Sequence, residues 1–227
     1  MECGEDDYMI IDALLISLKM SISSIIASSI VGILLANFLY RSKSKFKNLI
    51  ENFILLPMFL PPSIIGYGLL LLLSRNSFLG NYLLEHFNIR LIFTWQVGAI
   101  ATFIMALPII FQNSKSAFLS IDKDCEEAGR VDGASFIQVF FKIKIPMALR
   151  GLLGGIILGF ARAFGEFGAT IMVAGNIPGK TQNIPLAIYY AVDSGDTKIA
   201  NELFVFVLLF GFLLITIFNY LIVKSDY

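Results

Sequence analysis

Long uncharged runs of apolar residues recur along this chain, and their length indicates the class of protein. Four runs contain no charged side chain, namely Met20–Tyr40, Asn52–Ser74, Leu91–Ser114 and Leu203–Val223. A fifth run, Gly151–Ile177, is mostly apolar but carries Arg162 and Glu166. Because a helix needs about 20 apolar residues to cross a bilayer core, each run predicts a membrane span.

We therefore expect an all-α polytopic membrane protein of one domain, residues 1–227, with five transmembrane helices. The spans are expected at about 15–40, 49–74, 91–114, 150–176 and 203–224, with residues 115–149 as the longest connection. The alternative is a large soluble all-α core, but its helices would show polar faces. Composition favours the membrane, since 57% of residues are apolar and 15% are charged, against about 45–50% and about 25% in soluble domains.

The distribution of basic residues predicts the orientation of the spans. Lysine and arginine gather in the first and third connections and are sparse in the second and fourth. Those of the first and third are Arg41, Lys43, Lys45, Lys47, Lys115, Lys123, Arg130, Lys142, Lys144 and Arg150. Since cytoplasmic loops are enriched in these residues, we expect an outside N-terminus and a cytoplasmic C-terminus, which carries Lys224. The first residues are acidic, which also argues against a cleavable signal peptide.

Charge and reactive side chains exclude several functions. Lys plus Arg and Asp plus Glu both total 17, so nothing attracts an anionic polymer and no nucleic acid is expected as a partner. His86 is the only histidine, and Cys3 and Cys125 lie outside any CxxC pattern. We therefore expect no metal site, cofactor or disulfide framework. An intramembrane enzyme would need acid–base groups at membrane depth, where only Arg162 and Glu166 are ionisable.

The third connection carries a motif with fixed spacing. Its residues are Glu127, Ala128 and Gly129, then Gly133 after three residues, then Ile143, Lys144, Ile145 and Pro146 after nine more. Acidic residues lead the segment Asp124–Arg130, which predicts a short helix. Gly133 can adopt the positive φ that ends such a helix. The apolar stretch Phe136–Ile143 comes next, and Pro146 is expected to stop this stretch before the fourth span begins.

This spacing resembles the signature loop of permease subunits in ATP-binding-cassette importers, E-A-A-x3-G-x9-I-x-L-P. Gly129 and Ile145 depart from the pattern but keep the small and aliphatic classes. The resemblance implies that the short helix docks into a cleft of a separate ATPase subunit and transmits its motion. The ATPase-coupling residues are then expected to be Glu126, Glu127, Ala128, Gly129, Arg130, Gly133, Ala134 and Pro146. The alternative is an ordinary amphipathic helix at the membrane interface.

A second segment indicates which group of importer permeases the chain resembles most. Phe160–Tyr189 reads FARAFGEFGATIMVAGNIPGKTQNIPLAIY and closely resembles molybdate-importer permeases, whereas sulfate-importer permeases share mainly the GEFGA core and tungstate permeases are more distant. The resemblance implies the type I importer permease fold in the cytoplasmic membrane and a homodimer with the pathway on its axis. It also implies two cytoplasmic ATPase subunits, which hydrolyse the ATP, and an extracytoplasmic molybdate-binding protein. A passive channel would need no ATPase-docking loop.

Polar and helix-breaking residues within the spans are candidates for the translocation pathway. Arg162 and Glu166 stand four residues apart and can pair, either beside an anion pathway or as a structural ion pair. Each charge would cost about 2.5–3.5 kcal/mol at the bilayer centre, so neither should face lipid. Prolines interrupt the second span, either as a flexible bend or as a fixed break. The candidates are Arg162, Glu166, Gly168, Thr170, Pro61 and Pro62.

The fourth span and the connection after it carry two further patterns. Gly151, Gly155 and Gly159 recur every four residues, which predicts close approach of another helix. The candidate docking residues for a binding protein are Asn176, Pro178, Gly179 and Thr181, beside the short apolar segment Pro185–Val192. The sequence GNIPGKT has three residues between its glycines, where a phosphate-binding loop has four, so this chain is not expected to bind ATP.

Overall fold

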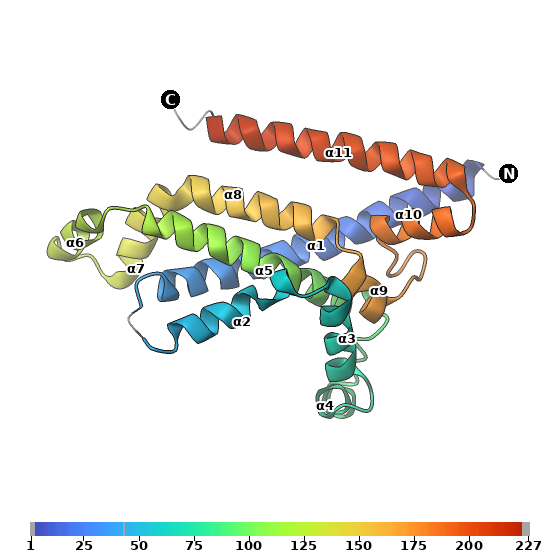
Figure 1. Cartoon of the computed structure of the whole chain (residues 1–227), viewed down its shortest axis with the longest axis horizontal. Coiled ribbons are helices and arrows are strands. Elements are labelled where there is room, and N and C mark those ends of the chain that lie inside the picture. Colours follow the sequence, from blue (N-terminus) through green and yellow to red (C-terminus); the bar gives the residue numbers. More distant parts are fainter. Residues whose placement is uncertain (1–2, 43, 224–227) are drawn as a thin grey trace.

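The computed structural model describes the backbone of residues 3–42 and 44–223, and all regular elements in these ranges are helices (Figure 1). Lys43 and Lys224, which entered the orientation argument, lie outside the described residues. The elements are α1 (Cys3–Leu39), α2 (Lys47–Phe59), α3 (Pro62–Leu73), α4 (Phe78–Phe87), α5 (Trp95–Leu119), α6 (Lys123–Val131), α7 (Phe136–Val139), the π-helix η1 (Phe140–Lys144), α8 (Ile145–Phe164), α9 (Gly168–Ala174), α10 (Ile184–Asp193) and α11 (Thr197–Val223). The all-α prediction is confirmed.

Three long helices form the packed centre of the molecule. α1, α5 and α8 pack against one another, and α11 lies along their outside, where it contacts α10 and α8 (Figure 1). Many large apolar side chains point outward from these helices; Phe38 on α1, for example, is 71% exposed and Phe212 on α11 is 70% exposed. An apolar exterior of this kind suits helices that are surrounded by lipid.

The second predicted span consists of two helices. α2 and α3 are bent by 113° at a short break between Phe59 and Pro62. Leu60 and Pro61, which separate them, are extended, with ψ of 142° and 135°, because a residue that precedes proline disfavours the helical region. Pro62 then begins α3, where its missing N–H costs nothing. Within the described residues, four helices are long and apolar enough to cross a membrane, and the bent pair makes a fifth crossing if it is counted as one.

The expectation that Pro146 stops the helix before the fourth span is wrong. α7, η1 and α8 follow one another without a break from Phe136 to Phe164. Within η1 the Ile145 N–H donates to the carbonyl of Phe140, five residues earlier. Pro146 comes immediately afterwards, in the first turn of α8, where the absence of its N–H is tolerated.

Glycines allow α8 to approach α5 closely, as their spacing predicts. A Cβ atom added to Gly155 would lie 2.7 Å from the Cβ of Asn113 on α5. One added to Gly159 would lie 2.7 Å from the Cγ1 of Ile110. Since real Cβ atoms do not come this close, only glycine permits the observed distance between the two helices.

Replacement of Gly155 by alanine should destabilise the protein, because the new methyl group must push α8 away from α5. Overpacking of this kind costs about 1–3 kcal/mol. Gly211→Ala on α11 is the matched control, since nothing lies within 4 Å of that position and the same change should stabilise the helix by about 0.5–1 kcal/mol. Thermal unfolding of the purified protein in detergent measures both effects. A Gly155→Ala protein as stable as the wild type would contradict the close packing.

Candidate functional site

The motif of the third connection folds into a helical hairpin, residues 122–139, at one end of the molecule (Figure 1). α6 begins where the Asp122 side chain accepts a hydrogen bond from the Asp124 N–H at 3.1 Å. It ends before Gly133, whose φ is +84°, as predicted. Ser135 and Gln138 then form a capping box that begins α7. α6 therefore begins at the acidic residues and ends before Gly133, as the sequence predicts.

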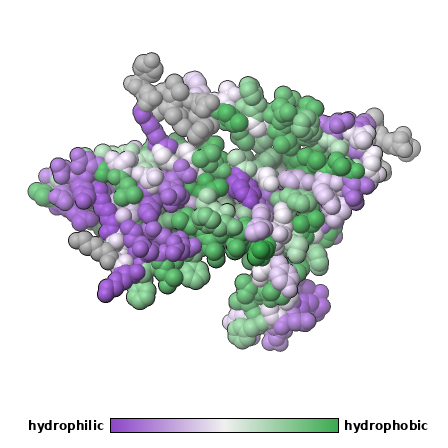
Figure 2. All heavy atoms as spheres, in the orientation of Figure 1, coloured by the Kyte–Doolittle hydropathy of each residue, from purple (hydrophilic) through white to green (hydrophobic). Residues whose placement is uncertain are grey.

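α6 presents one side to solvent and the other to the protein. Glu127 and Ala128 are exposed, whereas Glu126 is 3% exposed. Gly129 also faces inward, where an added Cβ would overlap the Cδ1 of Ile143. The small size of Gly129 thus serves packing within the chain, and Ala128 is the small residue of the exposed side. Figure 2 shows a hydrophilic surface at this end of the molecule.

The other predicted coupling residues fall into two places. Arg130 is exposed near the end of α6, and its carbonyl accepts the Gly133 N–H at 3.0 Å. The Ala134 N–H donates to the Gly129 carbonyl at 3.0 Å and closes the turn. Pro146 lies on a different element, in the first turn of α8. The structure therefore brings together residues 126–134 and leaves Pro146 outside the hairpin.

One carboxylate connects the hairpin to the long helices. Glu126 Oε1 accepts a hydrogen bond from the Tyr40 hydroxyl at 2.7 Å and lies 3.0 Å from Nη1 of Arg41. Its Oε2 lies 3.3 Å from Nζ of Lys144, which also donates to Oδ1 of Asn37 at 2.9 Å. We call these five residues the Glu126 cluster. They come from α1 and the two residues after it, from α6 and from η1.

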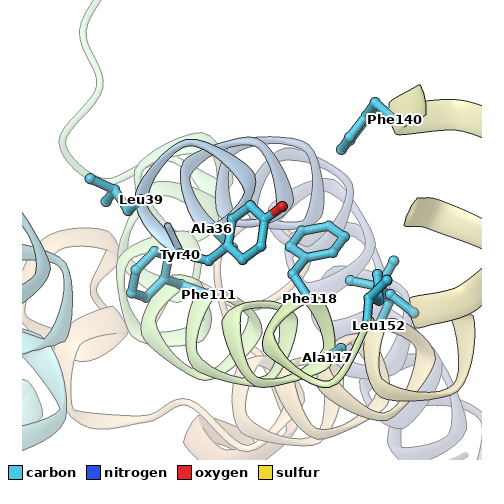
Figure 3. Close-up of a cluster of buried hydrophobic side chains, with 10 residues drawn as sticks. Ala36, Leu39, Tyr40, Phe111, Ala117, Phe118, Phe140 and Leu152 are labelled. Atoms are coloured by element: carbon cyan, nitrogen blue, oxygen red, sulfur yellow. The ribbon is translucent and has the colours of Figure 1, made fainter. Parts of the chain in front are cut away.

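The Glu126 cluster lies beside an aromatic core at the same end of the bundle. The Tyr40 ring is 5.7 Å from that of Phe118, which in turn is 6.3 Å from that of Phe140 (Figure 3). Lys144 and Glu126 are each only 3% exposed. Burial of a charge is costly unless the charge is paired, so these contacts are required wherever the two groups are ionised.

Sequence reasoning selected Glu126 but missed its three partners, Tyr40, Arg41 and Lys144, as site residues. It also missed Asn37, which accepts a hydrogen bond from Lys144. One signal was available, because Lys144 stands in an otherwise largely apolar stretch just before the fourth span. Nothing in the sequence distinguished Asn37 or Tyr40 from ordinary residues at the end of a span.

A separate ion pair lies at the other end of α8. Glu166 is 1% exposed and forms an ion pair with Arg162. Its Oε1 also accepts the Ala169 N–H, in the first turn of α9, at 2.8 Å. The carbonyl of Glu166 accepts a hydrogen bond from Nδ2 of Asn183 at 2.8 Å, immediately before α10. The pair thus joins α8, α9 and α10.

The breaks in the second and fourth spans lie next to each other. A Cβ added to Gly168, at the start of α9, would lie 3.0 Å from the Cβ of Pro62, at the start of α3. α3 and α9 continue side by side from there, and a Cβ on Gly66 would come within 2.8 Å of the Ala169 carbonyl. Thr170 is fully buried between helices. The structure thus assembles Pro62, Gly168 and their neighbours around one junction.

The predicted docking residues after α9 differ in what they can contact. Thr181 is fully buried, and its hydroxyl accepts the Ile177 N–H at 3.1 Å and bonds to the Gly175 carbonyl at 3.3 Å. It shapes the loop and is not available at the surface. Pro178 and Gly179 are exposed, and Asn176 is half-buried.

Known proteins resemble this chain over most of its length. Residues 28–225 match the family described as "Binding-protein-dependent transport system inner membrane component". A putative molybdenum transport system permease protein, YvgM of Bacillus subtilis, is 41% identical over 186 residues, which are 82% of each chain. The molybdenum transport system permease protein ModB of Haemophilus influenzae is 41% identical over 181 residues, 80% of this chain and 79% of ModB.

The fold also has solved counterparts. A bacterial ABC transporter involved in the import of the acidic polysaccharide alginate contains a chain that superposes with a TM-score of 0.79 at 17% identity. The match covers 95% of this chain and 79% of that one. Together with the sequence matches, it confirms the resemblance to importer permeases and the expected fold.

The Arg162–Glu166 pair should contribute strongly to stability. Arg162→Ala leaves the Glu166 carboxylate buried without its ion-pair partner, which costs about 3–5 kcal/mol in comparable pairs. The double variant Arg162→Met with Glu166→Gln removes both charges, and the glutamine oxygen can still accept the Ala169 N–H. Thermal unfolding in detergent should show a large loss for the single variant and recovery of most of it in the double variant. Equal stability of wild type and Arg162→Ala would refute the structural role.

Proposed function

This chain belongs to the family of binding-protein-dependent transport system inner membrane components, and we propose that it is the membrane-spanning permease subunit of an ATP-driven molybdate importer. Two relatives named for molybdenum transport share 41% of its residues over about four fifths of its length. The observation that carries the mechanism is the α6 hairpin, which stands beyond the ends of the long helices (Figure 1). The protein is a multi-pass component of the inner membrane.

The outer side of α6 is the proposed contact with the ATPase subunits. It offers Glu127, Ala128 and Arg130, all exposed, and the methyl group of Ala128 allows a partner surface to come close. In this mechanism ATP hydrolysis takes place on two separate cytoplasmic subunits. Closure of those subunits moves α6, and α6 moves the spans.

The arrangement of the chain ends supports an outside N-terminus and a cytoplasmic C-terminus. The α6 hairpin and the last turns of α11 lie at one end of the molecule, whereas the start of α1 lies at the opposite end (Figure 1). If the hairpin meets the ATPases in the cytoplasm, α11 ends there too. Pro178 and Gly179, as the exposed part of the loop after α9, then form the outer surface on which an extracytoplasmic molybdate-binding protein docks.

We place the translocation pathway beside the junction of the two helix breaks. Discontinuous helices commonly form the substrate route of transporters, because their ends leave backbone groups free to meet an ion. Pro61, Pro62 and Gly168 lie at this junction. A homodimer would bring two such junctions to a shared axis, with lipid around the outside. The Arg162–Glu166 pair holds the junction together next to the route.

The transported ion can be tested with the assembled importer. Wild-type permease is reconstituted in vesicles with its ATPase and binding protein, and uptake of radiolabelled molybdate is measured with and without ATP. We expect uptake that requires ATP, is abolished by excess unlabelled molybdate and is largely resistant to sulfate.

Other results would identify the alternatives. Equal competition by sulfate or by tungstate would reassign the substrate among the tetrahedral dianions. Molybdate movement without ATP or an ATPase would indicate a passive channel instead.

A change at Gly133 should uncouple uptake from ATP hydrolysis. Its φ of +84° suits glycine, and a β-branched residue at such a position costs about 1–3 kcal/mol. Gly133→Val should therefore distort the end of α6 and lower uptake per ATP hydrolysed several-fold, with insertion into the membrane intact. Gly133→Asn is the control, because asparagine tolerates this conformation and nothing lies within 4 Å of the position. Normal uptake by Gly133→Val would count against the docking role of α6.

A further inference from the structure

We propose that Glu126 is the positioning residue that makes the α6 hairpin and the long helices move as one body. This inference rests on the proposed function and assigns the joint through which the ATPases would act. Glu126 faces away from the side of α6 that is offered to them, and its carboxylate contacts two other elements. It is therefore a mechanical link within this chain rather than a contact with the partner.

Packing alone connects α6 to only part of the molecule. α6 packs mainly against α7 and η1, the segments that follow it in the chain. Its firm connection to α1 is polar, through the Tyr40 hydroxyl and the Arg41 guanidinium on the Glu126 carboxylate. Arg41 Nη2 also donates to the Ile121 carbonyl at 3.2 Å, just before α6. The end of α1 is thus held to both sides of the α6 start.

The geometry of the Glu126 cluster resists sliding. Its three contacts to the carboxylate lie between 2.7 and 3.3 Å, and hydrogen bonds are sensitive to both distance and angle. They approach from two different elements, the end of α1 and η1, so a displacement of α6 in most directions stretches at least one of them. Because Glu126 and Lys144 are buried, loss of either partner would leave a charge that is costly to hold. The hairpin is therefore held more rigidly than an apolar contact would hold it.

The π-helix η1 orients the Lys144 side chain toward the Glu126 carboxylate. Phe140, Lys144, Ala148 and Leu152 are all buried and follow one another at intervals of four residues. On a regular α-helix, positions four apart drift steadily around the axis. A π turn contains more residues than an α turn, so Phe140 and Lys144 stay nearly in line with the residues that follow. The hydrogen bond from Ile145 to Phe140 thus keeps the Lys144 ammonium on the side of α1 and α6.

The test compares transport with ATP hydrolysis in the reconstituted importer. Glu126→Gln keeps the size of the side chain but removes its charge. We expect molybdate uptake per ATP hydrolysed to fall by about tenfold, a usual size for coupling between sites, while the assembled complex still hydrolyses ATP. Glu202→Gln is the matched control, because Glu202 is exposed on α11 and far from the hairpin in sequence, and it should leave the ratio unchanged.

A second variant guards against loss of folding. Tyr40→Phe removes one hydroxyl and keeps the ring against Phe118. It should lower molybdate uptake per ATP hydrolysed by a smaller factor than Glu126→Gln does. A purely structural role of Glu126 would instead lower uptake and hydrolysis together, in proportion to the amount of assembled complex. An unchanged ratio in both variants would overturn the inference.

A distance measurement tests the joint without relying on transport. Spin labels are placed at Val131→Cys on α6 and Phe38→Cys on α1, which are 86% and 71% exposed, after Cys3 and Cys125 are replaced by serine. We expect a narrow distance distribution in the wild-type background and a broad one with Glu126→Gln. Equal widths would refute the rigid joint. If instead the wild-type importer showed no ATP-dependent uptake, the proposed function would fail, whatever the labels reported about the joint.

Discussion

In an apolar surrounding, every buried polar group needs a partner inside the protein, and this constraint explains how the ends of the helices are held. At the break after α8, the Glu166 carboxylate accepts the Ala169 N–H in the first turn of α9 and pairs with the Arg162 guanidinium. Asn183 binds the Glu166 carbonyl and begins α10. A break in a span is costly because it exposes backbone groups, and here charged and amide side chains satisfy those groups.

The need to pair buried polar groups also acts at the end of the molecule that carries the α6 hairpin. There the partners of the Glu126 carboxylate come from segments far apart in the chain, since Tyr40 stands 86 residues before Glu126. The contacts join the end of α1 to the α6 hairpin and to η1. Between the two ends, glycines bring α8 close against α5. The molecule thus has a tightly packed middle, one polar junction that holds broken helices and another that holds the hairpin.

Several features were predictable because they depend on neighbouring residues. Uncharged runs long enough to cross a bilayer, the glycine repeat of the fourth span and the helix end at Gly133 all act locally. The effect of Pro146 was mispredicted, because proline in a first turn does not end a helix and the π-helix before it removes the need for its N–H. Thr181 was placed at the surface because its burial depends on contacts that the sequence does not display.

The membrane class, the family and the position of α6 could be predicted before the fold was known, because hydrophobic length and motif spacing are properties of a linear chain. Only the tertiary structure decided which side of α6 faces outward and that Gly129 packs against Ile143. It also decided that Tyr40, Arg41 and Lys144 surround Glu126, and that the breaks at Pro62 and Gly168 meet. The physical reason is that a buried charge selects its partners by proximity in space, and helix packing sets that proximity.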